Sequence, residues 1–287
     1  MVFGHLIVFL LCFRKDILMK LSLFCLTDMM KENMRLFVDK VPVLRKPLFA
    51  ILTVIYSLGI IGLMVLLFYF INQIAWWGPL LSQGIITIVV TIIGLVHFIF
   101  APRFREKYGD LAYQKFFYIF MLPYLFTWYG CFFHPAFIQW GDKLLPIWAQ
   151  AILAAFFILL MILTNLQIEK AGFSVVTHGM DVFSVFPEET TIVRGEVYSF
   201  IRHPLHFSLL MGGFAMGFIS NTWVGLVMAT FQLVPSIIIG LREDKELITR
   251  SGDDHKEYIK QTALLLPFRK LLGFIKLLFM ENRGILS

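Results

Sequence analysis

The amino-acid sequence predicts an all-α, polytopic membrane helix bundle with a C-terminal helical hairpin and cytoplasmic amphipathic helices. Of the 287 residues, 59% are hydrophobic and 15% are charged, whereas soluble domains are about half apolar and a quarter charged. Four apolar segments reach the roughly 20 residues that a membrane-spanning helix needs. A fifth apolar segment, 207–240, is long enough for two passes.

The basic residues indicate which connecting segments face the cytoplasm. The four predicted spans are residues 48–71, 80–100, 116–133 and 147–166. Many Lys and Arg residues precede the first span, the second loop carries Arg103, Arg105 and Lys107, and others lie near Arg202 and in the C-terminal tail. The remaining loops carry only Lys143. Because basic residues favour the cytoplasmic side, we expect these basic segments there.

The chain divides into four regions by composition. They are an N-terminal cytoplasmic or interfacial segment (1–47), a four-span bundle (48–170), a region that contains the hairpin (171–267) and an interfacial amphipathic tail (268–287). Ser220-Asn221-Thr222 interrupt the apolar segment 207–240, which predicts a turn between two passes. Gly213 and Gly217 are spaced for close helix contact. Pro235 is expected to kink the second pass or open its backbone.

Short helices are expected beyond the hairpin. A charged helix over 242–250 would end at Gly252 as its C-cap. Asp254 and Glu257 have the spacing of a capping box for a second helix, which Pro267 would end. Residues 268–280 alternate basic and apolar side chains as a helix lying on the membrane surface would.

Several function classes are disfavoured by the same sequence. Cys12, Cys25 and Cys131 form no CxxC pattern, so neither a metal site nor a disulfide framework is indicated. The basic residues form no patch interleaved with aromatics, which disfavours a nucleic-acid partner. The spans show no repeat symmetry and few charges at membrane depth, which disfavours a transporter. A soluble Rossmann-type enzyme is excluded because the only glycine-rich run lies inside a membrane helix.

Two groups of ionisable residues bracket the hairpin. Arg202-His203-Pro204 precedes it, and Glu243-Asp244 follows about forty residues later. Pro204 suits the first turn of a helix and pushes His203 towards an extended conformation. The helix N-terminus and Arg202 would favour a carboxylate, whereas Glu243 would favour a cation. An amino-acid moiety carries both charges, and S-adenosylmethionine fits such a site, although the charge pattern does not single it out.

Simpler interpretations stay open on the residues alone. Arg202 has the position of a positive-inside anchor, and Glu243-Asp244 has the composition of a solvated helix surface. His206 and His97 lie in apolar surroundings, where a histidine is more often packed than catalytic. Ionisable groups beside a membrane helix are nevertheless costly unless they hold a partner.

The region 190–267, about a quarter of the chain, resembles the membrane-embedded superfamily of isoprenylcysteine carboxyl methyltransferase and phospholipid methyltransferases. The resemblance depends on Tyr198, Arg202-His203-Pro204, Glu243-Asp244, Leu247, Gly252, Tyr258 and Pro267. The chain departs from the family pattern in having His206 and His255 for Tyr, Asp244 for Glu and Ala263 for Pro. Residues 96–104, with His97, resemble the methanethiol S-methyltransferase, NnrU and nurim branch. Ile239 stands where the prenylcysteine enzymes have an acceptor-contacting Arg.

The resemblance implies an integral-membrane methyltransferase that uses S-adenosylmethionine. The acceptor would be a small, methanethiol-like thiol or another hydrophobic, lipid-like molecule that enters from the membrane lipid. By family position, the cofactor would contact Thr190, Thr191, Ile192, Val193, Tyr198, Arg202, His203, Pro204, His206 and Glu243. The catalytic residues would be Arg202, His206 and His97, with a histidine as base for a thiol.

The resemblance also leaves other functions open. One alternative is a catalytically degenerate scaffold protein like nurim or NnrU, and another is a phospholipid or prenylcysteine methyltransferase. The cofactor site would face the cytoplasm, in the inner membrane of a bacterium or in the endoplasmic reticulum or nuclear envelope of a eukaryote.

Overall fold

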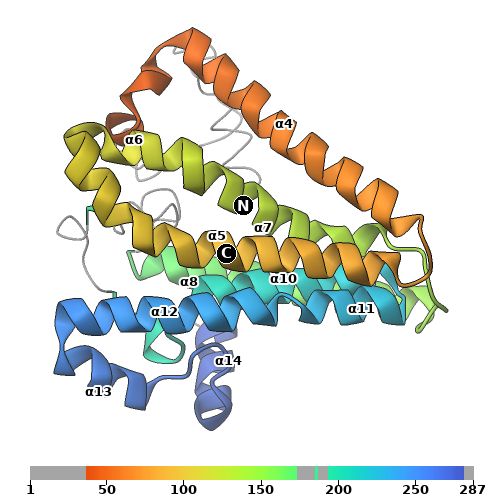
Figure 1. The fold of residues 1–287 in the computed structure, drawn as a ribbon. Helices are drawn as coiled ribbons and strands as arrows, with labels where there is room; N and C mark the ends of the chain where they lie inside the picture. Colours follow the sequence, from red (N-terminus) through yellow and green to blue (C-terminus); the bar gives the residue numbers. More distant parts are fainter. Residues whose placement is uncertain (1–36, 173–184, 187–192, 281–287) are drawn as a thin grey trace, which may run out of the picture. The chain divides into compact units, whose positions relative to one another are not determined.

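The computed structural model describes residues 37–172, 185–186 and 193–280 (Figure 1). Within these residues the chain is helical and contains no strand, which confirms the predicted all-α polytopic membrane bundle. Four helical stretches are long and apolar enough to cross a membrane: Pro47–Asn72, Gly78–Phe137, Ile147–Lys170 and Trp223–Ser251. Residues 1–36 of the predicted N-terminal cytoplasmic or interfacial segment lie outside the described residues.

The described residues form two compact units, which are described separately. The first contains residues 37–62, 96–126 and 185–186. It holds the 3-10 helix η1 and the first part of α4, where Thr53 Oγ1 lies 2.7 Å from the Tyr118 hydroxyl. The His97 ring is buried against Phe98, Phe116 and Tyr124. The elements of this unit are η1 (Pro42–Arg45), α4 (Pro47–Asn72), the end of α5 (Gly78–Tyr108), η2 (Gly109–Leu111), α6 (Ala112–Phe116), π-helical η3 (Phe117–Met121) and the start of α7 (Leu122–Phe133).

The prediction of a loop at Arg103 is wrong, because helix α5 continues to Tyr108. Arg105 and Lys107 lie in its last turn, where basic side chains interact favourably with the negative end of the helix dipole. The apolar pattern therefore ends before the helix does. Pro102 lies inside this helix.

The second unit contains residues 63–95, 127–172 and 193–280 and holds the hairpin. The hairpin is confirmed: α10 packs along α8 and returns into α11 and α12 (Figure 1). A Cβ atom at Gly217 would lie 3.1 Å from the Gly225 carbonyl oxygen, so the expected close contact exists. The elements of this unit include η4 (His134–Phe137), α8 (Ile147–Lys170), η6 (Glu196–Ser199), α10 (Pro204–Ser220), α11 (Trp223–Thr230), α12 (Leu233–Ser251), α13 (Asp253–Gln261), η7 (Phe268–Lys270) and α14 (Leu271–Met280).

The hairpin turn and the break in its second pass follow from particular residues. Asn221 has a left-handed φ of 56° at the C-cap of α10, and Thr222 Oγ1 accepts from the Gly225 N–H to begin α11. Pro235 cannot donate to the carbonyl of Phe231, four residues earlier. Val234 N–H donates to that carbonyl instead, and the helix breaks between α11 and α12, as expected for Pro235.

The helices after the hairpin agree with the sequence only in part. Gly252, with a φ of 60°, ends α12 as predicted. The prediction of a capping box that starts at Asp254 is wrong. Gly252 is the N-cap of α13, and Asp254 lies within the first turn of that helix. That helix ends at Gln261 rather than near Pro267. The reason is that Ala263 leaves the helix to exchange backbone hydrogen bonds with Phe200 and Arg202.

Helix α14 falls within the range 268–280 expected for the tail helix. Its buried side includes Phe274, whose ring contacts those of Phe200 and Phe207. Leu272 on the same helix is exposed. The position of α14 on a membrane surface stays a prediction.

Candidate functional site

The site begins where the chain turns into α10. Residues 200–202 run beside Ala263, and the Arg202 N–H donates to the Ala263 carbonyl over 2.8 Å. His203 is the N-cap of α10, with a φ of −119°, and Pro204 occupies the first helical turn. These backbone contacts bring the start of α10 to the end of α13. They explain how residues about sixty positions apart share one site.

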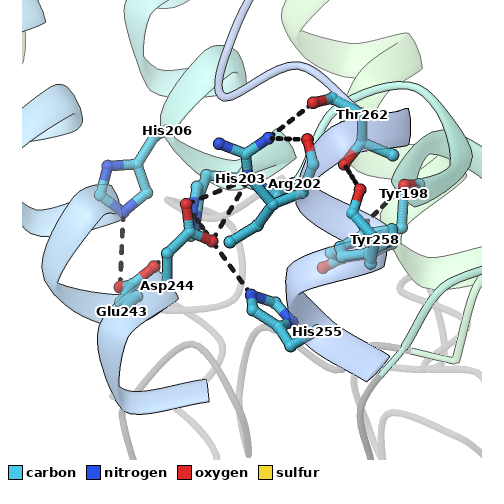
Figure 2. A network of polar contacts seen from close by, with 10 residues as sticks. Tyr198, Arg202, His203, His206, Glu243, Asp244, His255, Tyr258 and Thr262 are labelled. Atoms are coloured by element: carbon cyan, nitrogen blue, oxygen red, sulfur yellow. Dashed lines mark hydrogen bonds and ion pairs between the residues drawn. The ribbon is translucent and has the colours of Figure 1, made fainter. Parts of the chain in front are cut away.

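Arg202 is held inside the protein by three partners (Figure 2). Its Nε lies 3.0 Å from Oδ2 of Asp244, and its Nη1 donates to the carbonyls of Thr262 over 2.6 Å and of Ile259 over 3.2 Å. From the sequence, Arg202 and Glu243 were expected to share a ligand. In the structure the guanidinium pairs instead with the second acid of the pair, Asp244.

His203 lies between the two acids. Its Nδ1 is 2.8 Å from Oε2 of Glu243, and its Nε2 is 3.2 Å from Oδ1 of Asp244. Burial lowers the pKa of His203, but the hydrogen bonds to Asp244 and Glu243 outweigh this effect and raise the pKa to about 9. Because both ring nitrogens face an acceptor, His203 is an imidazolium ion that donates twice.

Glu243 is the more accessible of the two acids. Its side chain is 20% exposed, compared with 6% for Asp244. Its Oε1 lies 3.7 Å from Nε2 of His206, a distance longer than a hydrogen bond. The His206 ring meets the edge of Trp128 at 5.2 Å between ring centroids. Of the two carboxylates, Glu243 is therefore the one that an outside cation can reach.

Helix α13 completes the cluster with residues that the sequence analysis did not assign to the site. His255 Nε2 lies 3.2 Å from Oδ1 of Asp244. Burial lowers the pKa of His255, so its neutral ring donates this hydrogen bond. The Tyr258 hydroxyl donates to the Tyr198 carbonyl over 2.6 Å, and burial raises the pKa of Tyr258. The charges of Arg202, His203, Glu243 and Asp244 then balance, which is what a buried ionic cluster requires.

A sequence signal for Asp244 existed. Ser236, Gly240 and Asp244 follow one another at four-residue intervals, and all three lie on the buried face of α12. A charged residue that continues a buried face needs partners. Arg202 and His203 on the preceding segment were the available cations. For His255 we find no comparable signal.

The sequence-predicted site residues fall into three groups. Tyr198, Arg202, His203, Pro204, His206 and Glu243 lie in or beside the cluster, and Val193 is half-buried ahead of η6. His97 belongs to the first unit. Thr190, Thr191 and Ile192 lie outside the described residues. Among the described residues, no group of His, Cys, Asp or Glu side chains has the arrangement of a metal site.

Comparison with protein-family models, with curated proteins and with solved structures finds no match for this chain. The chemistry of the site is therefore inferred from its own residues. They are a partly accessible carboxylate, a buried imidazolium ion, an arginine, and His206, whose Nδ1 has no hydrogen-bond partner in the part of the chain that the structure describes.

Proposed function

We propose that this chain is an integral-membrane methyltransferase that uses S-adenosylmethionine to methylate a small thiol or another hydrophobic acceptor. The observation that supports the proposal is the accessible carboxylate of Glu243, which a buried network of opposite charges holds beside a membrane hairpin. We place the site on the cytoplasmic side, because basic residues are concentrated in the segments around it.

The residues of the cluster suit the amino-acid end of the cofactor. Glu243 would bind its ammonium group, replacing the long contact to His206. Among the described residues, Arg202 Nη2 makes no hydrogen bond or ion pair, unlike Nε and Nη1. It is therefore the donor that remains for the cofactor's carboxylate.

His206 would serve the acceptor. When bound, S-adenosylmethionine supplies an electrophilic methyl group. A thiol acceptor must lose its proton as its sulfur forms the new bond to carbon and the carbon–sulfonium bond breaks. His206 Nδ1 is buried and has no hydrogen-bond partner among the described residues. It can accept this proton, whereas a role for His97 stays a prediction.

Binding of S-adenosylhomocysteine tests the proposal. Isothermal titration of the purified protein should detect binding, and Glu243→Gln should weaken it about 10- to 100-fold, since a charge-assisted hydrogen bond is lost. Glu257→Gln is the matched control, because Glu257 is exposed on α13 and pairs with Lys260. No binding by the unchanged protein at millimolar ligand would refute the proposal.

A second candidate function is a non-catalytic membrane scaffold. The observation that favours it is that both oxygens of Glu243 already face histidines, at 2.8 Å and 3.7 Å. In that case the cluster only holds α10, α12 and α13 together. S-adenosylhomocysteine would then fail to bind, and Glu243→Gln would lower the thermal unfolding midpoint.

A further inference from the structure

The break between α11 and α12 places an amide inside the membrane-embedded part of the hairpin. Pro235 causes the break, and Gln232 lies at it, immediately before α12. Broken helices at membrane depth occur where the irregular backbone is buried in protein or lines a binding site. Gln232 is completely buried, with an exposed fraction of 0%.

Two polar side chains at this break have no hydrogen-bond partner within the described part of the chain. Among the described residues, neither Oε1 nor Nε2 of Gln232 makes a hydrogen bond, and the same holds for Oγ of Ser236. Ser236 is also 0% exposed and lies one helical turn further along. A buried amide without a partner is destabilising, so its presence inside an apolar hairpin requires a physical reason.

Helix α10 faces this break and has Gly213 opposite the side-chain amide of Gln232. A Cβ atom at Gly213 would be 1.9 Å from Nε2 of Gln232. The same face of α12 leads through Gly240, which approaches the His203 ring, to Asp244, the neighbour of Glu243. With a rise of 1.5 Å per residue, Glu243 lies about 16 Å along the helix from Gln232. A face of hydrogen-bonding and small residues thus extends from the candidate site into the membrane.

We propose that Gln232 and Ser236 bind the uncharged polar group of a membrane-soluble molecule. The group both donates and accepts hydrogen bonds, as a primary amide or a hydroxyl does, because Gln232 offers an unpartnered acceptor and an unpartnered donor. The bound group is uncharged, because the buried face of α12 has no ionisable residue between Gln232 and Glu243. The inference rests on the proposed function in one respect: it identifies this molecule as the methyl acceptor, and it selects the hydrophobic, lipid-like acceptor rather than the small thiol.

Hexanamide is a suitable probe, and 2-heptanone is its matched control. The ketone has the same shape but carries a methyl group where the amide has its donor. Purified protein should bind hexanamide about tenfold more tightly than 2-heptanone, as one lost hydrogen bond predicts. Equal affinity for the two probes, or no binding of either, would overturn the proposal.

Gln232→Leu separates a binding role from a structural one. Leucine keeps much of the volume and removes two unpartnered polar atoms, so the ligand-free variant should unfold at an equal or higher temperature while the preference for hexanamide disappears. Gln150→Leu is the control, because Gln150 already donates to the Ile219 carbonyl; this variant should keep the preference. A lower midpoint for Gln232→Leu, or an unchanged preference, would contradict the proposal.

Two variants separate the Gln232 subsite from the candidate cofactor site. Gln232→Leu should bind S-adenosylhomocysteine as the unchanged protein does, and Glu243→Gln should keep its preference for hexanamide. Loss of both ligands in Gln232→Leu would mean that the substitution disturbs the whole hairpin, and would overturn the assignment of a separate subsite.

Discussion

Asp244 connects three segments of the chain at a single carboxylate. It accepts hydrogen bonds from Arg202 before α10, from His203 at the start of α10 and from His255 on α13. Among the described residues, its neighbour Glu243 pairs with two histidines, His203 at the N-cap of α10 and His206 within it. Asp244 therefore holds these three segments together, whereas Glu243 keeps an accessible side. This difference between adjacent residues arises because Asp244 lies on the buried face of α12.

The imidazolium of His203 predicts a dependence of stability on pH. Its pKa of about 9 lies above the ordinary value of 6.5, so its stabilising effect is complete below about pH 6.5 and is lost as the pH rises through 9. We expect the thermal unfolding midpoint to fall by several degrees between pH 7 and pH 9.5. The measurement is a set of thermal scans across this range.

His203→Gln provides the comparison for this prediction. Glutamine can hydrogen bond to the acids but does not titrate, so this variant should have a lower midpoint at pH 7 and a smaller fall above it. If the two proteins lost stability in parallel as the pH rises, His203 would not be the group responsible.

The residues before and after the hairpin were predictable as neighbours, and the four-residue spacing of Ser236, Gly240 and Asp244 favours Asp244 as the buried acid. Pro204 predicted where the hairpin begins, and Glu243 and Asp244 predicted where it ends. The choice of Asp244 as the partner of Arg202 depends on the rotation of α12 about its axis, and on this helix Gly240 lies against the His203 ring. The approach of Ala263 to Phe200, which also positions His255, is a tertiary contact with no local sequence signal.

At the scale of elements, α10 is the helix on which the second unit is built. It packs against α8, α11, α12 and η4, and its small residues permit these contacts. Gly212 faces Phe132 and Met161, Gly213 faces Gln232, and Gly217 faces Gly225. Without a hydrophobic effect between helices in lipid, such close packing is a main source of association.

Gly213→Ala should disturb this packing. The new methyl group would lie 1.9 Å from Nε2 of Gln232, and we expect the free energy of unfolding to fall by about 1–3 kcal/mol, as overpacking does elsewhere. Gly59→Ala in α4 is the control, since a Cβ atom there meets nothing within 4 Å. Denaturant unfolding in detergent measures both. A Gly213→Ala variant as stable as Gly59→Ala would show that the amide moves away freely.

The sequence predicted which helices exist, but it predicted where they begin and end less accurately. Apolar length predicted the spans and the hairpin, and Pro235 predicted the break in its second pass. The boundaries that were missed have tertiary or terminal causes. Helix α5 continues past its apolar part because basic residues suit a helix end, and α13 stops early because Ala263 pairs with Phe200 and Arg202.

At the scale of the whole second unit, the two ends of the hairpin differ in charge. The end with Arg202 and Glu243 is ionic. At the other end, η4 packs on α10 and α11 and carries a chain of neutral hydrogen bonds. Ser82 donates to Asn72, Asn72 donates to His134 Nε2, and the remaining nitrogen of His134 therefore donates to Gln83. This chain fixes one neutral tautomer of His134.

The loop before α8 closes this end of the hairpin. Asn221 Nδ2 donates to the carbonyl of Leu145, and its side-chain oxygen accepts from the Leu145 N–H. Lys143 Nζ donates to the carbonyl of Ser220. The hairpin turn and the loop 138–146 therefore lie together at one end of the hairpin, and the ionic cluster lies at its other end.

Cysteine labelling tests which side is which. In a variant without the three native cysteines, Asp142→Cys lies in the loop beside the hairpin turn and Lys256→Cys is exposed on α13. Because the segments around α13 are rich in basic residues, we expect a membrane-impermeant maleimide to label Asp142→Cys in intact spheroplasts and Lys256→Cys only after permeabilisation. Labelling of Lys256→Cys in intact spheroplasts would place the ionic cluster outside the cytoplasm, where S-adenosylmethionine is not made, and the proposed enzyme would then lack its methyl donor.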